Sequence, residues 1–130
     1  MAVQIHKQFF SDLAGALEDI GKHGFWPTTY VSDASPAVPT HWHDCDVHGY
    51  LLEGQSWVLD GESGERLDVV AGDKLVIPAG CLHAEGENTE RVVYLVALPE
   101  PRPFHPFLKT YAPDDPARPG ASGDPDGGPA

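Results

Sequence analysis

The sequence predicts an all-β domain, an antiparallel sandwich or barrel, with one short helix near its N-terminus. Short runs of apolar, β-branched and aromatic residues recur between residues 28 and 98, and turns containing glycine separate them. No helical pattern lies among these runs. Many short strands without intervening helices are typical of antiparallel sandwiches and barrels.

The expected helix covers residues 11–23. Leu13, Leu17 and Ile20 recur at i, i+4 and i+7, which is the spacing of one helix face. Ser11 is expected to cap the start of the helix. We expect this helix to pack on or beside the main core and to have no catalytic role.

The strands are expected to follow the helix in a regular series. The first extended piece covers residues 28–32, and a loop at 33–39 follows because its prolines prevent regular pairing. The run at 91–98 is strongly apolar and predicts a buried strand. The other strands are expected at 47–52, 56–59, 66–70 and 74–77 and around His83.

A chain of 130 residues is long enough for one domain. Beyond residue 112 it has no large apolar side chain, which predicts disorder because little surface is buried to offset the entropy of ordering. The C-terminal arm before it contains Phe104, Phe107, Leu108 and Tyr111 and is expected to pack as an extended segment. Either this arm or the N-terminal segment is expected to cross over to a second subunit. The expected organisation is an N-terminal helical segment at 1–24, a barrel at 25–100, the arm at 101–111 and a disordered tail at 112–130.

The chain is strongly acidic, with 8 Lys and Arg residues against 20 Asp and Glu residues and a net charge of −12. Such a surface repels phosphate backbones and anionic lipids, so we expect neither nucleic acid nor a membrane as a partner. The sequence has no apolar run long enough to span a bilayer, and residues 1–10 lack the long apolar core expected of a signal peptide. Two cysteines fit a reducing compartment. We expect a cytoplasmic location.

Histidines are dense in one stretch, where His41, His43 and His48 lie within eight residues. Side chains alternate between the two faces of a strand, so His41 and His43 project to the same side. Two imidazoles on one face can hold a metal ion if another strand supplies a third ligand. His83, in a separate turn marked by proline and glycine, is the candidate.

The segment before His83 has a distinctive spacing. Gly72 is followed after five residues by Pro78, then by Gly80, and after two more residues by His83. The glycines permit turn backbones that other residues resist, and the proline ends a strand.

With the histidine pair, this spacing resembles the two motifs of the cupin superfamily. His41 and His43 match the H-x-H of the first motif, and Gly54 matches its closing glycine. The position of the usual glutamate ligand holds Val47, or His48 if the longer motif spacing applies. The second motif ends on asparagine in the superfamily, and here that position holds Glu87.

The resemblance covers residues 25–100 and is to small single-domain bacterial cupins. It implies an antiparallel cupin barrel, also called a double-stranded β-helix or jelly roll, in which His41, His43 and His83 face the interior. These three residues would hold one divalent transition metal. Zinc, iron(II), nickel and copper all accept neutral imidazole, and the sequence does not select among them. The alternative is an emptied site in which the histidines only line a pocket.

His48 is an open candidate for a fourth metal ligand. If Val47 faces inward, strand alternation points His48 outward unless a bulge changes its direction. The ligand set is therefore three histidines, with His48 undecided.

Several other residues lie near the site. Cys45 and Cys81 can bind zinc or react as thiolates, or they can be thiols without a role. Asp44 and Asp46 can orient the second nitrogen of a histidine, although a solvent-facing position is the preferred reading.

Two carboxylates share the strand parity of His83, namely Glu85 and Glu87. One of them can point into the pocket as an acid or base. Trp57 and Tyr94 are expected in the core or the barrel wall and not as a platform for substrate.

These features favour a mononuclear metalloenzyme of dioxygenase type that acts on a small organic molecule. Isomerase and lyase chemistry stay open, and no catalytic residue is assigned. The alternative is a non-catalytic module that binds a small ligand or the metal. A purely structural barrel is the least favoured option. Exposed sheet edges need cover, so a homodimer is expected.

Overall fold

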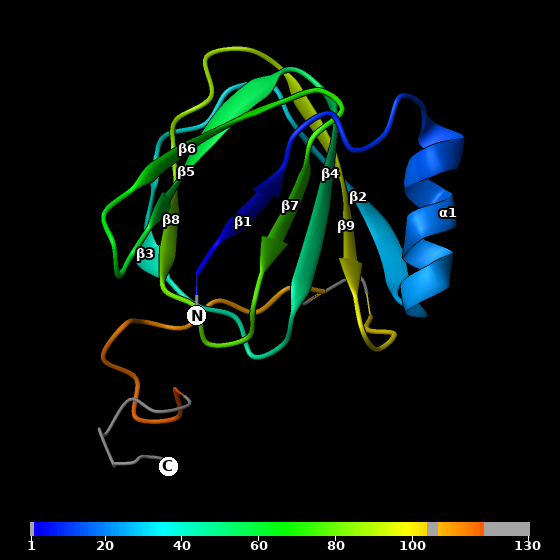
Figure 1. Ribbon diagram of the computed structural model, residues 1–130. Helices are drawn as coiled ribbons and strands as arrows, with labels where there is room; N and C mark the ends of the chain where they lie inside the picture. The colour runs from blue at the N-terminus through cyan, green and yellow to red at the C-terminus, as the bar shows by residue number, and fades with distance from the viewer. Residues whose placement is uncertain (1, 104–106, 119–130) are drawn as a thin grey trace.

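The structure, a computed structural model, describes residues 2–103 and 107–118. It confirms the all-β class, with two antiparallel sheets packed face to face and helix α1 outside one of them (Figure 1). The five-stranded sheet has the order β1-β7-β4-β9-β2, and the four-stranded sheet has the order β3-β8-β5-β6. The elements are β1 (Gln4–His6), α1 (Leu13–His23), β2 (Trp26–Ser32), β3 (Val38–His41), β4 (Val47–Glu53), β5 (Gln55–Asp60), β6 (Arg66–Val70), β7 (Lys74–Ile77), β8 (His83–Glu85) and β9 (Val92–Leu98).

Two strands were not expected from the sequence. β1 has three residues, too few to show the two-residue alternation of a strand. It pairs with β7, and Ile5 lies opposite Leu75. The N-terminal segment therefore adds a strand to the sheet as well as a helix. β3 lies partly in the expected loop at 33–39 and contains Pro39. β3 is an edge strand that pairs with β8 alone, and proline is tolerated on an edge.

Asp12, and not Ser11, caps helix α1. The Asp12 side chain accepts a hydrogen bond from the backbone N–H of Gly15 at 2.9 Å. The helix begins at Leu13, two residues later than expected. Gly24 ends it with a φ of 69°, a left-handed conformation that glycine adopts without steric cost.

The buried face of α1 also differs from the expected one. Ala16 and Ile20 are buried in a cluster with Tyr50 of β4. Leu13 and Leu17 are 51% and 43% exposed, so the apolar period located the helix but not the whole of its packed face.

A buried ion pair joins α1 to the sheet beneath it. Nζ of Lys74, a residue 4% exposed, lies 2.6 Å from Oδ2 of Asp19. The hydroxyl of Tyr50 donates to the same oxygen at 2.5 Å. Because the pair is satisfied on both sides, the charge of Lys74 is tolerated between helix and sheet.

The C-terminal arm packs against its own chain. Tyr111 exchanges backbone hydrogen bonds with Trp42, and their rings stack with centroids 4.4 Å apart. Phe107 and Leu108 pack against the main hydrophobic core. In Figure 1 the arm, in orange, crosses the lower end of the two sheets. Phe104 lies outside the described residues.

The first part of the expected disordered tail is ordered. The Trp42 indole N–H donates to the carbonyl of Ala112 at 2.8 Å. Arg118 donates to the carbonyl of Gly80 at 2.8 Å and pairs with Glu62 at 3.1 Å. Polar backbone contacts thus replace the apolar burial that this segment lacks. Residues 119–130 lie outside the described residues.

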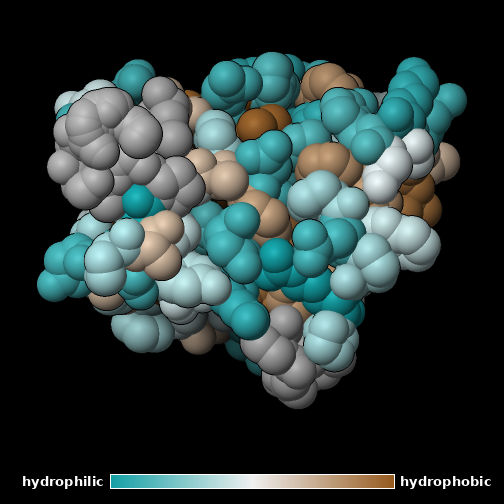
Figure 2. All heavy atoms as spheres, turned by 90° about the horizontal axis from the view of Figure 1, so that it is seen from below, coloured by the Kyte–Doolittle hydropathy of each residue, from teal (hydrophilic) through white to brown (hydrophobic). Residues whose placement is uncertain are grey.

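The end of the molecule crossed by the arm is mainly hydrophilic, with small apolar areas between polar side chains (Figure 2). Among the residues that the structure describes, no helix has the length and apolar character needed to cross a membrane.

Candidate metal centre

Three histidines from separate segments converge between the two sheets. His41 ends β3, His83 begins β8 opposite it, and His43 follows in the loop that leads to β4. Each offers a ring nitrogen within 4.8 Å of the others, and all three are buried. The ring centroid of His83 lies 4.3 Å from that of His41 and 4.9 Å from that of His43. The structure therefore brings together the three residues that the sequence grouped.

A backbone carbonyl fixes the second nitrogen of each ring. Nδ1 of His41 lies 2.8 Å from the carbonyl oxygen of Pro39. Nδ1 of His43 lies 2.8 Å from that of Lys109, and Nδ1 of His83 lies 3.0 Å from that of Cys81. A carbonyl oxygen only accepts hydrogen bonds, so each Nδ1 carries the hydrogen.

This pattern fits a metal ion at the centre of the cluster. When Nδ1 of a neutral imidazole carries the hydrogen, Nε2 presents a lone pair. Burial lowers the pKa of His43 to about 4, so its ring is neutral at physiological pH. Nε2 of His83 is buried without a hydrogen-bond partner. Oriented, neutral imidazoles with hydrogen-bonded Nδ1 atoms are the usual ligands of transition metals.

Glu85 adds a carboxylate to the three imidazoles. Its Oε2 lies 2.9 Å from Nε2 of His83, and its Oε1 lies 3.5 Å from Nε2 of His41. Burial raises the pKa of Glu85, but its contacts with the imidazoles of His83 and His41 lower it overall. The carboxyl group is therefore ionised near neutral pH.

The spacing of Glu85 from two of the imidazoles is close to that of ligand atoms that share one ion. Two ligand atoms, each about 2.1 Å from a metal, lie roughly 3.0 to 3.4 Å apart in tetrahedral or octahedral sites. The observed separations of 2.9 and 3.5 Å lie just outside the two ends of that range. A lone pair on Nε2 facing a carboxylate is otherwise repulsive, so a cation between them satisfies both groups.

The sequence pointed to Glu85 and Glu87 equally, and only Glu85 reaches the site. β8 ends at Glu85, so strand alternation does not extend to Glu87, which is exposed. The carboxylate thus lies two residues after His83 and not at the position of Val47, where the cupin motif places it.

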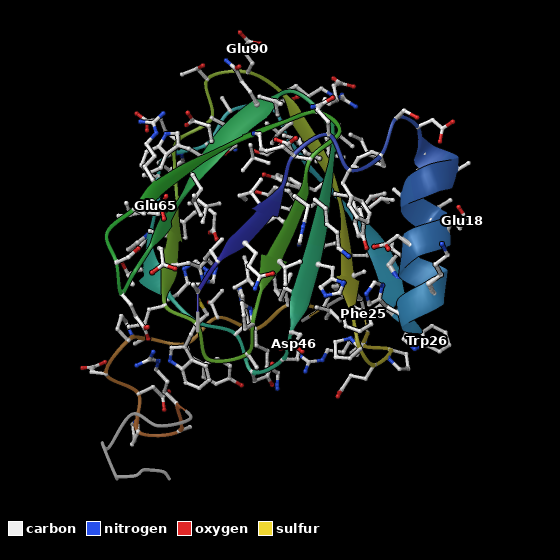
Figure 3. All side chains as sticks on the ribbon, in the orientation of Figure 1. Glu18, Phe25, Trp26, Asp46, Glu65 and Glu90 are labelled. Carbon is white, nitrogen blue, oxygen red and sulfur yellow. The ribbon has the colours of Figure 1, made fainter. Side chains whose placement is uncertain are left out.

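His48 lies outside the histidine cluster, so the structure does not support it as a fourth ligand. Val47 packs in the core between the sheets, and the next residue of β4 points the other way. The His48 ring stacks on Phe25 at 4.3 Å and meets His23 edge-on at 5.0 Å. Phe25 lies near the C-terminal end of α1 (Figure 3). No bulge re-aims His48, because the register shift in β4 comes later, between Leu51 and Glu53.

The aspartates beside the histidines make other contacts. Asp44 pairs with Arg102 at 3.0 Å. Asp46, at the lower end of β4 in Figure 3, accepts a hydrogen bond from the backbone N–H of Ala79 at 2.8 Å. Backbone carbonyls, and not these carboxylates, orient the imidazoles.

Both cysteines are buried thiols. Burial raises the pKa of Cys45 and of Cys81 to about 11. A thiol with that pKa has almost no thiolate at neutral pH, so neither residue is an activated nucleophile.

A cavity of about 290 Å³ opens beside the cluster. His41, His43 and Glu85 form part of its wall. Tyr94 also lines it, as expected for a wall residue, whereas Trp57 packs against Gly86 outside the lining. The remaining lining residues are mostly apolar or neutral and include Val38, Val47, Leu75, Ile77, Val96, Leu108, Ser35, Ser56, Asn88 and Thr110.

No protein-family model matches the sequence, and no curated protein matches it. Solved structures do match the fold. A DUF861 family protein of Thermotoga maritima is similar with a TM-score of 0.54 and 21% identity, over 74% of this chain and 98% of that one. The polyketide cyclase RemF of Streptomyces resistomycificus has a TM-score of 0.54 and 24% identity, over 72% of this chain and 63% of the cyclase.

A conserved Klebsiella pneumoniae protein with a double-stranded β-helix domain is also similar, with a TM-score of 0.50 and 14% identity over 69% of this chain and 76% of that one. These similarities and the sheet topology show the fold, which is a double-stranded β-helix. Identities this low carry no assignment of activity.

Proposed function

We propose that this protein is a mononuclear metalloenzyme that acts on a small organic molecule in the cavity beside His41, His43 and His83. The observation that carries the proposal is the common orientation of the three rings, whose Nδ1 atoms are each held by a carbonyl oxygen. A purely structural cluster has no need of three free, converging lone pairs. Dioxygenase-type oxidation is the first candidate reaction, and the similarity to a cyclase keeps other chemistry open.

Glu85 is proposed as the carboxylate ligand that accompanies the three histidines. Nitrogen and carboxylate donors together suit a divalent first-row transition ion. When bound, such an ion supplies Lewis-acid activation of a substrate oxygen and, in the case of iron(II), a place for dioxygen. The carbonyl groups of Pro39, Cys81 and Lys109 hold the rings, and the apolar wall of the cavity limits the access of water.

The experiment for the enzyme is oxygen uptake by the iron(II)-loaded protein with a panel of thiols, diketones and phenols. Oxygen consumption that needs substrate and is lost in the His43→Ala variant supports the proposal. If the metal-loaded protein consumes no oxygen with any compound but binds some of them, dioxygenase activity is wrong and the non-catalytic binding module replaces it.

The role of Glu85 has its own test. Glu85→Gln keeps the shape of the side chain and removes its charge, and we expect it to weaken metal binding at least as much as the loss of a residue that only orients a ligand, roughly 10- to 100-fold. Glu87→Gln is the matched control, because Glu87 is exposed and has the same charge. Equal metal affinity in wild type and Glu85→Gln would assign Glu85 to proton transfer or to no role.

A homodimer and a cytoplasmic location remain proposals. β2 is an edge strand that exposes Trp26, Tyr30 and Val31, so a second copy can cover it. A single monomeric species in light scattering at micromolar concentration would contradict the dimer.

A further inference from the structure

Among the described residues that line the cavity, none is a lysine or an arginine. All eight basic residues of the chain lie in the described part. Lys22 lies on α1 and lines a different hollow, and Lys109 is exposed. The others each pair with a carboxylate away from the cavity: Lys7, Arg66, Lys74, Arg91, Arg102 and Arg118.

The histidines and Glu85 lie at one end of the cavity. In β5, Asp60 lies opposite His83 and Val58 lies opposite Glu85. Ser56 is two residues earlier in β5, on the same face as Val58 and farther from the histidines. The register therefore places Ser56 at the end of the cavity remote from the cluster.

The other polar groups at this remote end are neutral. Burial, with the charge of Glu85, raises the pKa of Tyr94 above its ordinary value, so its hydroxyl stays protonated. Asn88 donates from its amide to the Ser35 hydroxyl at 3.2 Å. An anionic group at this end would find no cationic partner in the cavity lining. The net charge of −12 adds long-range repulsion.

The volume sets the size of the occupant. An engineered apolar cavity of about 150 Å³ holds benzene. A cavity of about 290 Å³ therefore holds a molecule of the size of one substituted ring.

From the composition of the cavity lining and the volume of the cavity, we infer that the occupant is a compact molecule of the size of one substituted ring. It has an oxygen-bearing head at the histidines and an uncharged, largely apolar body. This inference rests on the proposed function and names its substrate class. Molecules with a second anionic group far from the head, such as sugar phosphates and dicarboxylates, are rejected. Ser56 lies beside the end of the bound molecule that is farthest from the histidines.

Two probes test the charge of the body directly. 4-Methylbenzoate and benzene-1,4-dicarboxylate share one ring and one carboxylate head, and they differ only in a remote methyl or carboxylate group. The dicarboxylate is symmetric, so reversing its direction changes nothing. Calorimetric titration of the zinc-loaded full-length protein should show 4-methylbenzoate binding at least roughly tenfold more tightly.

Ser56→Arg places a cation at the remote end, and Ser56→Gln is the matched neutral control. We expect Ser56→Arg to reverse the preference in favour of the dicarboxylate and Ser56→Gln to keep it. Circular dichroism of both variants confirms that they fold. If the arginine variant does not fold, the two-probe comparison on wild-type protein alone decides the matter.

Failure of this inference differs from failure of the proposed function. Equal or tighter binding of the dicarboxylate by wild-type protein overturns the inference, and so does the absence of any binding of 4-methylbenzoate to zinc-loaded protein. Failure of the protein to bind zinc in the same calorimeter overturns the metal centre itself.

Discussion

The backbone carbonyl oxygen of Lys109 lies 2.8 Å from Nδ1 of His43 and fixes the direction in which the imidazole points. Sixty-six positions separate the two residues in the chain. The C-terminal arm therefore orients a residue of the candidate metal site as well as covering one end of the sheets. Leu108 and Thr110, on either side of Lys109, line the cavity.

Ending the chain after Pro103 removes this carbonyl and should weaken metal binding by roughly 10- to 100-fold, the usual cost of losing a partner that orients a ligand. Calorimetric titration with zinc measures the effect. A chain ended after Arg118 is the control, because it keeps the described contacts of the arm. Equal zinc affinity of both truncated chains would show that the arm does not orient His43.

Asp19→Ala should lower the free energy of unfolding by about 3 to 5 kcal/mol, because it leaves the buried charge of Lys74 without its partner. The double variant Asp19→Leu/Lys74→Met should recover much of this loss, since it removes both charges. Urea denaturation measures both values. A loss below 1 kcal/mol in the single variant would mean that Lys74 reaches water by another route.

Gly86→Ala should destabilise the protein by about 1 to 3 kcal/mol. A Cβ atom at Gly86 would lie 2.1 Å from the ring of Trp57, so the ring or the strand must move. Gly21→Ala is the matched control, because a Cβ atom there meets nothing within 4 Å, and in a helix interior it should stabilise by about 0.5 to 1 kcal/mol. Chemical denaturation followed by tryptophan fluorescence measures the free energy of unfolding of both variants and shows whether the two changes have opposite signs.

His48 should make the protein sensitive to acid. Burial, with the charges of Lys74 and His23, lowers the pKa of His48 from 6.5 to about 4, against the opposing charges of Asp19 and Asp46. The unfolded chain thus binds more protons between these values, and the free energy of unfolding falls as the pH falls from 6.5 toward 4.

Replacing His48 by Phe should flatten this dependence, since phenylalanine fills the space beside Phe25 and does not titrate. Unfolding of the metal-free proteins in urea at several pH values between 4 and 7 measures the slopes. Parallel slopes for wild type and variant would contradict the burial of a neutral His48.

The sequence predicted the structure well where particular residue types occur at a characteristic spacing. The H-x-H spacing and the turn before His83 grouped three histidines that the structure brings together, and strand alternation argued that His48 faces away. β6 and β7 were located to the residue. These successes depend on the two-residue period of strands and on turns that glycine and proline mark.

The sequence was not informative where the contact involves backbone atoms or a short segment. Nothing in the residue type of Lys109 or Cys81 indicates that its carbonyl group orients a histidine. The alternation of side chains along a strand could not show which of Glu85 and Glu87 reaches the site, because the answer depends on where β8 ends. The aromatic residues of the arm predicted that it packs but not against what, because its position depends on the stacking of Tyr111 on Trp42.

The most direct test of the metal centre is the metal-to-protein ratio after metal-free protein is dialysed against zinc, iron(II), nickel or copper. We expect one ion per chain for the wild type and for Glu87→Gln, and almost none for the double variant His41→Ala/His83→Ala with unchanged circular dichroism. The same ratio in wild type and double variant with every metal would contradict a metal centre formed by His41, His43 and His83.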